Sequence, residues 1–250
     1  MSGAQSEQVV QQVVVSSAQP MAEVDHHHRD VTGGWLRPAV FGAMDGLVSN
    51  SALVAGVAGG SGGRHTVLVA GLAGLVAGAI SMAAGEYTSV ASQAELATAE
   101  IEAERQELLA HPGPEQEELA RIYMARGVDP DLARQVAAQL SRDPESALEV
   151  HVREELGIDP DELPSPVVAA GSSFGFFAVG AAVPVLPYVL GAGLLLSVLV
   201  TLLALFLGGA VVSRVTARPW WFSGGRQLVL GGLALAVTWV VGNAVGGVAG

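Results

Sequence analysis

The chain has 250 residues and a formal net charge of −12, yet only 14% of its residues are charged, whereas 50% are hydrophobic. So little charge is unusual for a soluble globular domain, while apolar stretches rich in glycine, of which there are 32, are typical of packed transmembrane helices. The absence of cysteine excludes disulfides and thiolate metal ligands.

Residues 1–34 are expected to form a disordered, cytoplasmic polar tail. The stretch VVQQVVV (9–15) has neither the positive n-region nor the long apolar region of a signal peptide. The tail also contains His26, His27 and His28 in the sequence DHHHRD. Three adjacent histidines attract metal ions, but their spacing defines no coordination geometry.

Four apolar segments follow the tail, and a helix needs roughly 20 apolar residues to cross the hydrocarbon core. The segment 165–213 has 49 residues without a charge, enough for two helices with a break within PVLPYVLGAG (184–193). We therefore predict an all-α membrane protein with five transmembrane helices, helices 1–2 within 35–92 and helices 3–5 within 164–250. The apolar segments are 36–58, 66–85, 165–213 and 227–250.

Residues 93–163 form a polar insert between the second and third spans, with 18 of the 24 acidic residues. No helix breaker precedes HPGP (111–114), so the second span is expected to continue as a helix to about residue 110. A further helix is predicted over 115–126, and two more begin at Asp-Pro pairs, at Asp129 and Asp143. Apolar residues at helical spacing predict a small core: Leu119, Ile122, Leu132, Val136, Leu140, Leu148 and Val152.

The arginines predict the orientation, because the chain contains no lysine. With a cytoplasmic N-terminus, 11 of the 12 arginines lie on the cytoplasmic side and only Arg64 lies outside. The insert 93–163 is then cytoplasmic, and the odd number of spans puts the C-terminus on the opposite side. The expected membrane is a bacterial plasma membrane.

Asp45 is the only ionisable residue between Arg37 and Arg64. A carboxylate at the centre of a span costs about 2.5–3.5 kcal/mol on insertion scales, so it indicates a functional site. The alternative is a buried aspartate whose oxygens are satisfied by neighbouring hydroxyl or main-chain groups. Gly42 and Gly46 form a GxxxG face that lets another helix approach closely.

Met82 and Glu86 lie four residues apart in the second span and therefore share a helix face. Carboxylate oxygen combined with thioether sulfur suits a borderline transition metal better than Ca²⁺ or Mg²⁺. Asp45, Met82 and Glu86 are therefore expected to line a transmembrane ion path. The alternative for Met82 is ordinary packing in an apolar helix.

The insert carries three spaced pairs of metal-ligand residues: Glu104 with Glu107, Glu115 with Glu118, and His151 with Glu155. Carboxylates and a histidine from separate helices build iron and manganese sites in helical bundles. The alternative is that these glutamates simply form solvated helix faces. Because an unperturbed imidazole has a pKa near ~6.5, coordination by His151 predicts metal affinity that falls between about pH 7 and 5.5.

These stretches together resemble the vacuolar iron transporter family of proton-coupled Fe²⁺ exporters. The resemblance covers nearly everything after Trp35, and it rests on DGLVSN, ISMAAGEYTSVASQAE, the spacing ExxE-x7-ExxE, VPVLPY and GGLALAVTWVVG. It implies a homodimer of five spans per chain, with the ion path at the dimer interface and a cytoplasmic domain that binds metal. The GEY sequence at Glu86 is similar to bacterial members, whereas plant members carry methionine in place of His151.

The resemblance also implies roles for individual residues. Asp45 and Met82 would bind the ion within the membrane, and the glutamates Glu104, Glu107, Glu115, Glu118 and Glu155 would bind it in the cytoplasm. The expected substrate is Fe²⁺, with Mn²⁺, Zn²⁺ and Co²⁺ as further candidates, and it moves out of the cytoplasm in exchange for H⁺. Metal and proton would compete for the same carboxylate oxygens. Neither a cofactor nor a nucleic-acid partner is expected.

Two other classes of function stay open on the sequence. A membrane-anchored metal buffer or sensor would use the insert without needing Asp45 or Met82. An intramembrane hydrolase is disfavoured, because all 6 histidines lie outside the spans and no Ser-His or zinc-binding pair lies within them. The chain is therefore not expected to be an enzyme.

Overall fold

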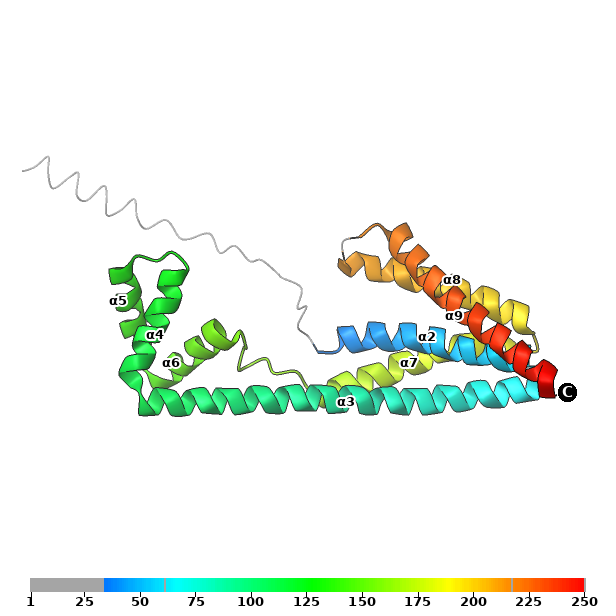
Figure 1. Cartoon of the computed structure of the whole chain (residues 1–250), viewed down its shortest axis with the longest axis horizontal. Coiled ribbons are helices and arrows are strands. Elements are labelled where there is room, and N and C mark those ends of the chain that lie inside the picture. Colours follow the sequence, from blue (N-terminus) through cyan, green and yellow to red (C-terminus); the bar gives the residue numbers. More distant parts are fainter. Residues whose placement is uncertain (1–33, 61, 217, 250) are drawn as a thin grey trace, which may run out of the picture. The chain divides into compact units, whose positions relative to one another are not determined.

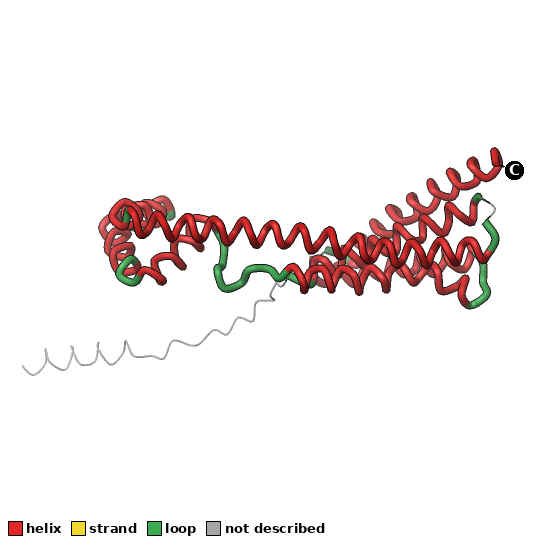
Figure 2. The backbone as a smooth tube through the Cα atoms, turned by 90° about the horizontal axis from the view of Figure 1, so that it is seen from below, coloured by secondary structure: helices red, strands yellow, loops and turns green. Residues whose placement is uncertain are grey.

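The structure, a computed structural model, describes residues 34–60, 62–216 and 218–249. Every regular element among these residues is a helix (Figure 2). The predicted tail lies outside the described residues except for Gly34, and so do His26, His27 and His28.

In the described part of the chain, five helices are long and apolar enough to cross a membrane, which confirms the predicted all-α class and the number of spans. α9 begins at Trp220, earlier than the predicted start at residue 227. The apolar residues Trp220, Trp221 and Phe222 belong to the helix, and Arg226 does not interrupt it. The α7–α8 break follows Val189, inside the predicted region. The five helices are α2 (Leu36–Gly59), α3 (Arg64–Ala110), α7 (Pro166–Val189), α8 (Leu194–Thr216) and α9 (Trp220–Ala249) (Figure 1).

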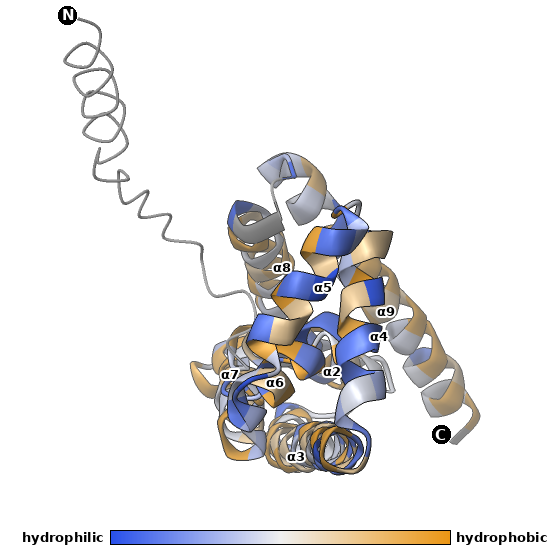
Figure 3. Ribbon diagram, turned by 90° about the vertical axis from the view of Figure 1, so that its left-hand side faces the viewer, coloured by the Kyte–Doolittle hydropathy of each residue, from blue (hydrophilic) through white to orange (hydrophobic). Residues whose placement is uncertain are grey.

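α3 is a single helix of 47 residues, as the absence of breakers predicted. It packs against α2 and α7 along its first part and against the insert helices near its end. The insert contains α4 (Pro112–Ala125), α5 (Pro130–Leu140), α6 (Pro144–His151) and a π-helical turn, η1 (Val152–Leu156). Hydrophilic stretches are prominent on α4 and α5, whereas α9 is mainly apolar (Figure 3).

Proline defines the starts of the insert helices. α4 begins at Pro112 rather than at the predicted residue 115, because proline lacks the N–H that would have no partner in a first helical turn. Asp129 caps α5 by accepting hydrogen bonds from the backbone N–H groups of Asp131 and Leu132, at 3.0 and 3.3 Å. Asp143 caps α6 in the same way through Ser146 N, at 3.0 Å.

The insert core differs from the prediction in α5. Leu119 and Val152 are fully buried, as predicted, but Leu132 is 53% exposed. Ala133 and Ala137 form the buried face of α5 instead. The small side chains let α5 pack closely against α4, where Leu119 and Ala120 join Ala137 in one apolar cluster. The helical spacing of apolar residues in α5 is compatible with more than one buried face. It does not decide whether the face with Leu132 or the face with Ala133 and Ala137 is packed.

Glycines permit close contact between α2 and α7. A Cβ atom built on Gly46 would lie 2.3 Å from the main-chain oxygen of Phe177, and one on Gly180 would lie 2.2 Å from that of Ala43. No side chain can fit between main chains at that separation. The GxxxG face formed by Gly42 and Gly46 therefore packs against α7, which the sequence did not identify as the partner helix.

We expect Gly180→Ala to destabilise the protein by about 1–3 kcal/mol, because the added methyl group forces α2 and α7 apart. The matched control is Gly175→Ala on the same helix, where a Cβ meets nothing within 4 Å. The control should be neutral or stabilising by up to about 1 kcal/mol, since alanine is the better helix former. Thermal unfolding of the detergent-solubilised protein measures both, and equal melting temperatures would contradict the close α2–α7 contact.

Candidate metal sites

The three residues predicted for the ion path line one cleft between α2 and α3. Asp45 projects from α2, and Met82 and Glu86 project from α3, around a volume of about 390 Å³. The remaining lining residues are Phe41, Ser49, Gly78, Ser81, Gly85, Ser89 and Phe177. The structure thus brings together a carboxylate from each helix and a thioether, although their role as ion ligands stays a prediction.

Burial differs among these three side chains. Glu86 is 9% exposed, whereas Asp45 and Met82 are only partly buried. Ser49 does not bond to the Asp45 carboxylate; its hydroxyl donates to the main-chain oxygen of Asp45, at 2.6 Å. Among the interactions recorded for the described residues, none satisfies the Asp45 carboxylate, so the alternative of a structurally satisfied aspartate gains no support.

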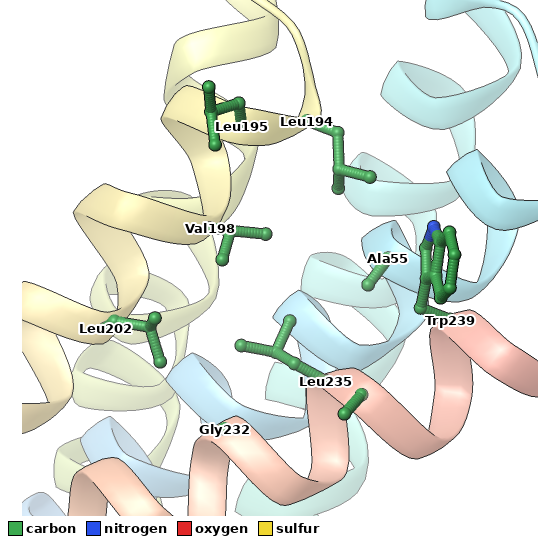
Figure 4. Close-up of a pocket in the computed structure, with 9 residues that line it drawn as sticks. Ala55, Leu194, Leu195, Val198, Leu202, Gly232, Leu235 and Trp239 are labelled. Atoms are coloured by element: carbon green, nitrogen blue, oxygen red, sulfur yellow. The ribbon is translucent and has the colours of Figure 1, made fainter.

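A second and larger groove in the membrane region has a different character. It measures about 560 Å³ and lies between α2, α8 and α9, where Ala55, Leu194 and Trp239 are among its lining residues (Figure 4). All of its lining side chains are apolar or glycine, so it offers no ligand for a cation. The smaller α2–α3 cleft is therefore the candidate ion site.

The insert holds a compact cluster of metal-ligand residues from three helices. His151 Nδ1 of α6 lies 3.1 Å from Glu104 Oε1 of α3 and 3.9 Å from Glu115 Oε2 of α4. One ligand atom from each of the three residues lies within 4.8 Å of the others. Glu155 Oε2 lies 4.0 Å from His151 Nδ1, at the edge of the cluster. The ExxE spacing and the helix break at His111 account for this arrangement, because α4 returns alongside the end of α3.

Three buried polar atoms of this cluster have no hydrogen-bond partner. His151 is fully buried, and Glu104 and Glu115 are 7% and 8% exposed. Both ring nitrogens of His151 and Glu104 Oε1 lack a hydrogen bond, since the 3.1 Å approach does not have hydrogen-bond geometry. Leaving buried polar atoms unpaired costs free energy, so such atoms call for an explanation by function. A cation bound between His151 Nδ1 and Glu104 Oε1 accounts for two of these atoms, while His151 Nε2 stays without a partner.

The electrostatics of the cluster favour a cation as well. Burial, together with the charges of Glu155 and Glu115, raises the pKa of Glu104 to about 7. Burial is also the main reason why the pKa values of Glu115 and Glu155 are raised. Burial and mutual repulsion oppose the ionisation of these carboxylates. A bound divalent ion would offset both effects, so that all of them would be charged.

His151 titrates differently from the sequence expectation. Burial lowers its pKa, against an opposing effect of Glu118. The imidazole therefore stays neutral and available as a ligand to lower pH than an unperturbed histidine. We therefore expect metal affinity to fall on acidification mainly through protonation of Glu104 rather than of His151.

The other predicted residues of the insert lie further from the cluster centre. Glu107 is exposed and Glu118 is half-buried. Their charges raise the pKa values of Glu104, Glu115 and Glu155, which places them in the same electrostatic neighbourhood. The π-helical turn that carries Glu155 was not predicted, and such turns occur frequently at functional sites.

Comparison with known proteins identifies the family of this chain. The model of the VIT family matches residues 36–243. The chain belongs to the VIT family. The "Vacuolar iron transporter" of Acanthamoeba castellanii is 40% identical over 227 residues, which cover 84% of this chain and 78% of the relative. "Vacuolar iron transporter 1" of rice is 33% identical over 227 residues, which cover 88% of this chain and 90% of the relative.

A third relative, "Vacuolar iron transporter 1" of Arabidopsis thaliana, is 32% identical over 231 residues, which cover 89% of this chain and 91% of the relative. The matches include both candidate sites of this VIT-family chain, since the family match runs from residue 36 to residue 243. The relatives are named as transporters, which are not enzymes, so the chain is not an enzyme. Together with the five apolar helices, the family makes it an integral, multi-pass membrane protein.

The raised pKa of Glu104 predicts how stability depends on pH without metal. The folded value is about 7 against an ordinary value of 4.5, so the folded state holds a proton that the unfolded state releases. Its contribution to stability is present below about pH 4.5 and is lost as the pH rises towards 7. The melting temperature of metal-free protein should therefore fall over this range by less in Glu104→Gln than in the unaltered protein.

Glu100→Gln is the control for this measurement, because Glu100 is exposed on the same helix, α3. Thermal unfolding of all three proteins in chelator at several pH values measures the effect. An unchanged pH dependence in Glu104→Gln would contradict the assignment.

Proposed function

We propose that this protein transports a divalent transition metal out of the cytoplasm, Fe²⁺ first and Mn²⁺ as a second candidate, in exchange for protons. The observation that carries the proposal is the α2–α3 cleft, in which Asp45 and Glu86 supply carboxylate oxygens and Met82 supplies sulfur. The names of the relatives support iron as the substrate.

The chemistry of the cleft supports exchange of an ion for a proton. A mixed oxygen and sulfur ligand set suits Fe²⁺ better than the harder ions Ca²⁺ and Mg²⁺. A carboxylate in an apolar surrounding is stabilised either by a cation or by a proton. An ion that leaves Asp45 must therefore be replaced by a proton before the site can reset, and this replacement couples the two flows.

The insert cluster is proposed to load the ion from the cytoplasm. Glu104, Glu115 and His151 provide two carboxylates and a neutral imidazole, a suitable set for Fe²⁺, Mn²⁺, Zn²⁺ or Co²⁺. The insert and the N-terminus are proposed to be cytoplasmic, and the C-terminus lies across the membrane, because that orientation puts 11 of the 12 arginines inside.

We further propose that two copies of the chain form the working unit. Ser81, Gly85 and Ser89 line the cleft yet are exposed in the single chain. Polar groups that face acyl chains are costly. A second copy packed over α2 and α3 would cover them and complete the wall of the cleft.

The test is transport into proteoliposomes. Purified protein is reconstituted, a pH gradient is imposed with the acidic side opposite the insert, and uptake of Fe²⁺, Mn²⁺, Co²⁺ and Zn²⁺ is measured alongside the internal pH. We expect Fe²⁺ uptake that requires the gradient and raises the pH of the acidic side. A metal buffer or sensor would bind Fe²⁺ stoichiometrically at the insert and give no flux, which would overturn the proposal.

A further inference from the structure

Asn50 joins three membrane helices through one side chain. It lies on α2 and is 2% exposed. Its Nδ2 group donates to the main-chain oxygen of Gly71 on α3, at 3.1 Å, and to that of Ala181 on α7, at 2.6 Å. One side chain thus joins α2 to both α3 and α7.

Asn50 lies directly beyond the end of the α2–α3 cleft that is furthest from the insert. The cleft ends at Ser49 on α2 and at Gly78 on α3. One turn further along the path, Gly74 of α3 lies against the Asn50 amide, because a Cβ on Gly74 would be 2.7 Å from Asn50 Oδ1. The amide, together with Leu53, whose Cδ2 atom would lie 2.5 Å from the same Cβ, fills the space between α2 and α3 where the cleft would otherwise continue.

Two further layers lie beyond the amide. Val54, Val67, Val185 and Tyr188 form an apolar cluster in which every side chain is at most 5% exposed. Arg64 then donates through Nε to the main-chain oxygen of Tyr188, at 2.9 Å, and through Nη2 to that of Val189, at 3.3 Å. Within the single chain, these two layers fill the space between α2, α3 and α7 on the side of the cleft opposite the insert.

We infer that Asn50 is the positioning residue that closes the far end of the cleft and that its two interhelical hydrogen bonds break when an ion passes. This inference rests on the proposed transport function, because a transporter must not open on both sides at once. Hydrogen bonds between membrane helices are individually weak, so this closure is reversible. Asn50 Oδ1 has no hydrogen-bond partner in the closed arrangement, and this cost also favours reopening.

Cysteine labelling tests the inference directly, because the natural chain has no cysteine. Ser49→Cys places a thiol at the end of the cleft, and Val54→Cys places one beyond Asn50. A charged methanethiosulfonate reagent is applied to oriented proteoliposomes from the side that carries α4–α6. With Asn50 present, Ser49→Cys should react and Val54→Cys should not.

Asn50→Asp keeps the side-chain shape but removes both N–H donors. In that background Val54→Cys should become reactive, because the loss of two interhelical hydrogen bonds raises the population of the open state roughly five- to tenfold. Asn50→Ala should give at least the same rise. Ser49→Cys should react at an unchanged rate in every background and serves as the reference for reagent access.

Ser51→Ala is the matched control, because Ser51 is also buried on α2 but its hydroxyl donates to Val48 O within the same helix, at 3.0 Å. It should leave Val54→Cys unreactive. Reaction of Val54→Cys with Asn50 present, no rise with Asn50→Asp, or an equal rise with Ser51→Ala would each overturn the inference. Labelling requires no ion flux, so the expected pattern in a protein that fails to transport Fe²⁺ would support the closure and overturn only the proposed function.

Discussion

Replacing Glu104 and Glu115 together by glutamine should lower the affinity of the purified protein for Fe²⁺ about 100-fold or more. The two substitutions remove the charged ligand atoms of the buried cluster but preserve its shape. They also remove two carboxylates whose pKa values burial raises, so the metal-free fold should not be weakened. Anaerobic calorimetry with Fe²⁺, repeated with Zn²⁺, measures the affinity, and the melting temperature reports on the fold.

The matched control replaces Glu107 and Glu118, the other members of the two ExxE pairs, by glutamine. The Glu107 side chain is exposed and the Glu118 side chain is half-buried. Both belong to the surroundings of the cluster rather than to its centre. Their loss should weaken binding by about tenfold or less, as expected for groups that act through the electrostatic surroundings of the ligands. Equal losses in the two double variants would show that the buried cluster is not the principal insert site.

The sequence predicted the helical framework well where local chemistry determines it. The length of α3 follows from the absence of any helix breaker before His111. Helices begin after Asp129 and Asp143 because an aspartate side chain caps the N–H groups of the first turn and the following proline fits that turn. The burial of Leu132 was predicted wrongly, because the packed face of α5 depends on how closely α4 approaches.

The candidate sites were predictable in composition but not in detail. The spacing of Met82 and Glu86 indicated a shared face, and the ExxE pairs indicated two helices folded against each other. Burial of His151 and the missing hydrogen bonds depend on packing, which no spacing records. Asn50 was missed for the same reason: a single asparagine in an apolar helix has no pattern, and its importance comes from carbonyl groups on two distant helices.

α3 connects the two candidate sites physically. Glu86 lines the membrane cleft and Glu104 belongs to the insert cluster, and both are buried on this helix. They are separated by five full turns at about 3.6 residues per turn, so they lie on the same face roughly 27 Å apart. A continuous helix therefore aligns the proposed loading site with the proposed ion path.

Asp45→Asn should reduce Fe²⁺ transport in proteoliposomes by about 100-fold or more while the protein still inserts and folds. The substitution keeps the side-chain shape, and a neutral amide is no harder to bury than a carboxylate. It removes a charged ligand for a dehydrated cation and the group that exchanges that cation for a proton. Fe²⁺ binding at the insert should persist, because Glu104, Glu115 and His151 lie outside the cleft.

Met82→Leu, in the same cleft, tests whether the charge of the carboxylate or the soft sulfur ligand contributes more to transport. It removes a neutral sulfur ligand at similar volume, so transport should fall less than in Asp45→Asn and preference should move towards the harder ion Mn²⁺. Flux of Fe²⁺ and Mn²⁺ is measured for both variants, with insert binding as the control for folding. Near-normal Fe²⁺ flux in a well-folded Asp45→Asn protein would contradict the mechanism, because no other ionisable side chain lies on α2 between Arg37 and the helix end at Gly59. The ion would then have to cross without the one charge that α2 places in the cleft.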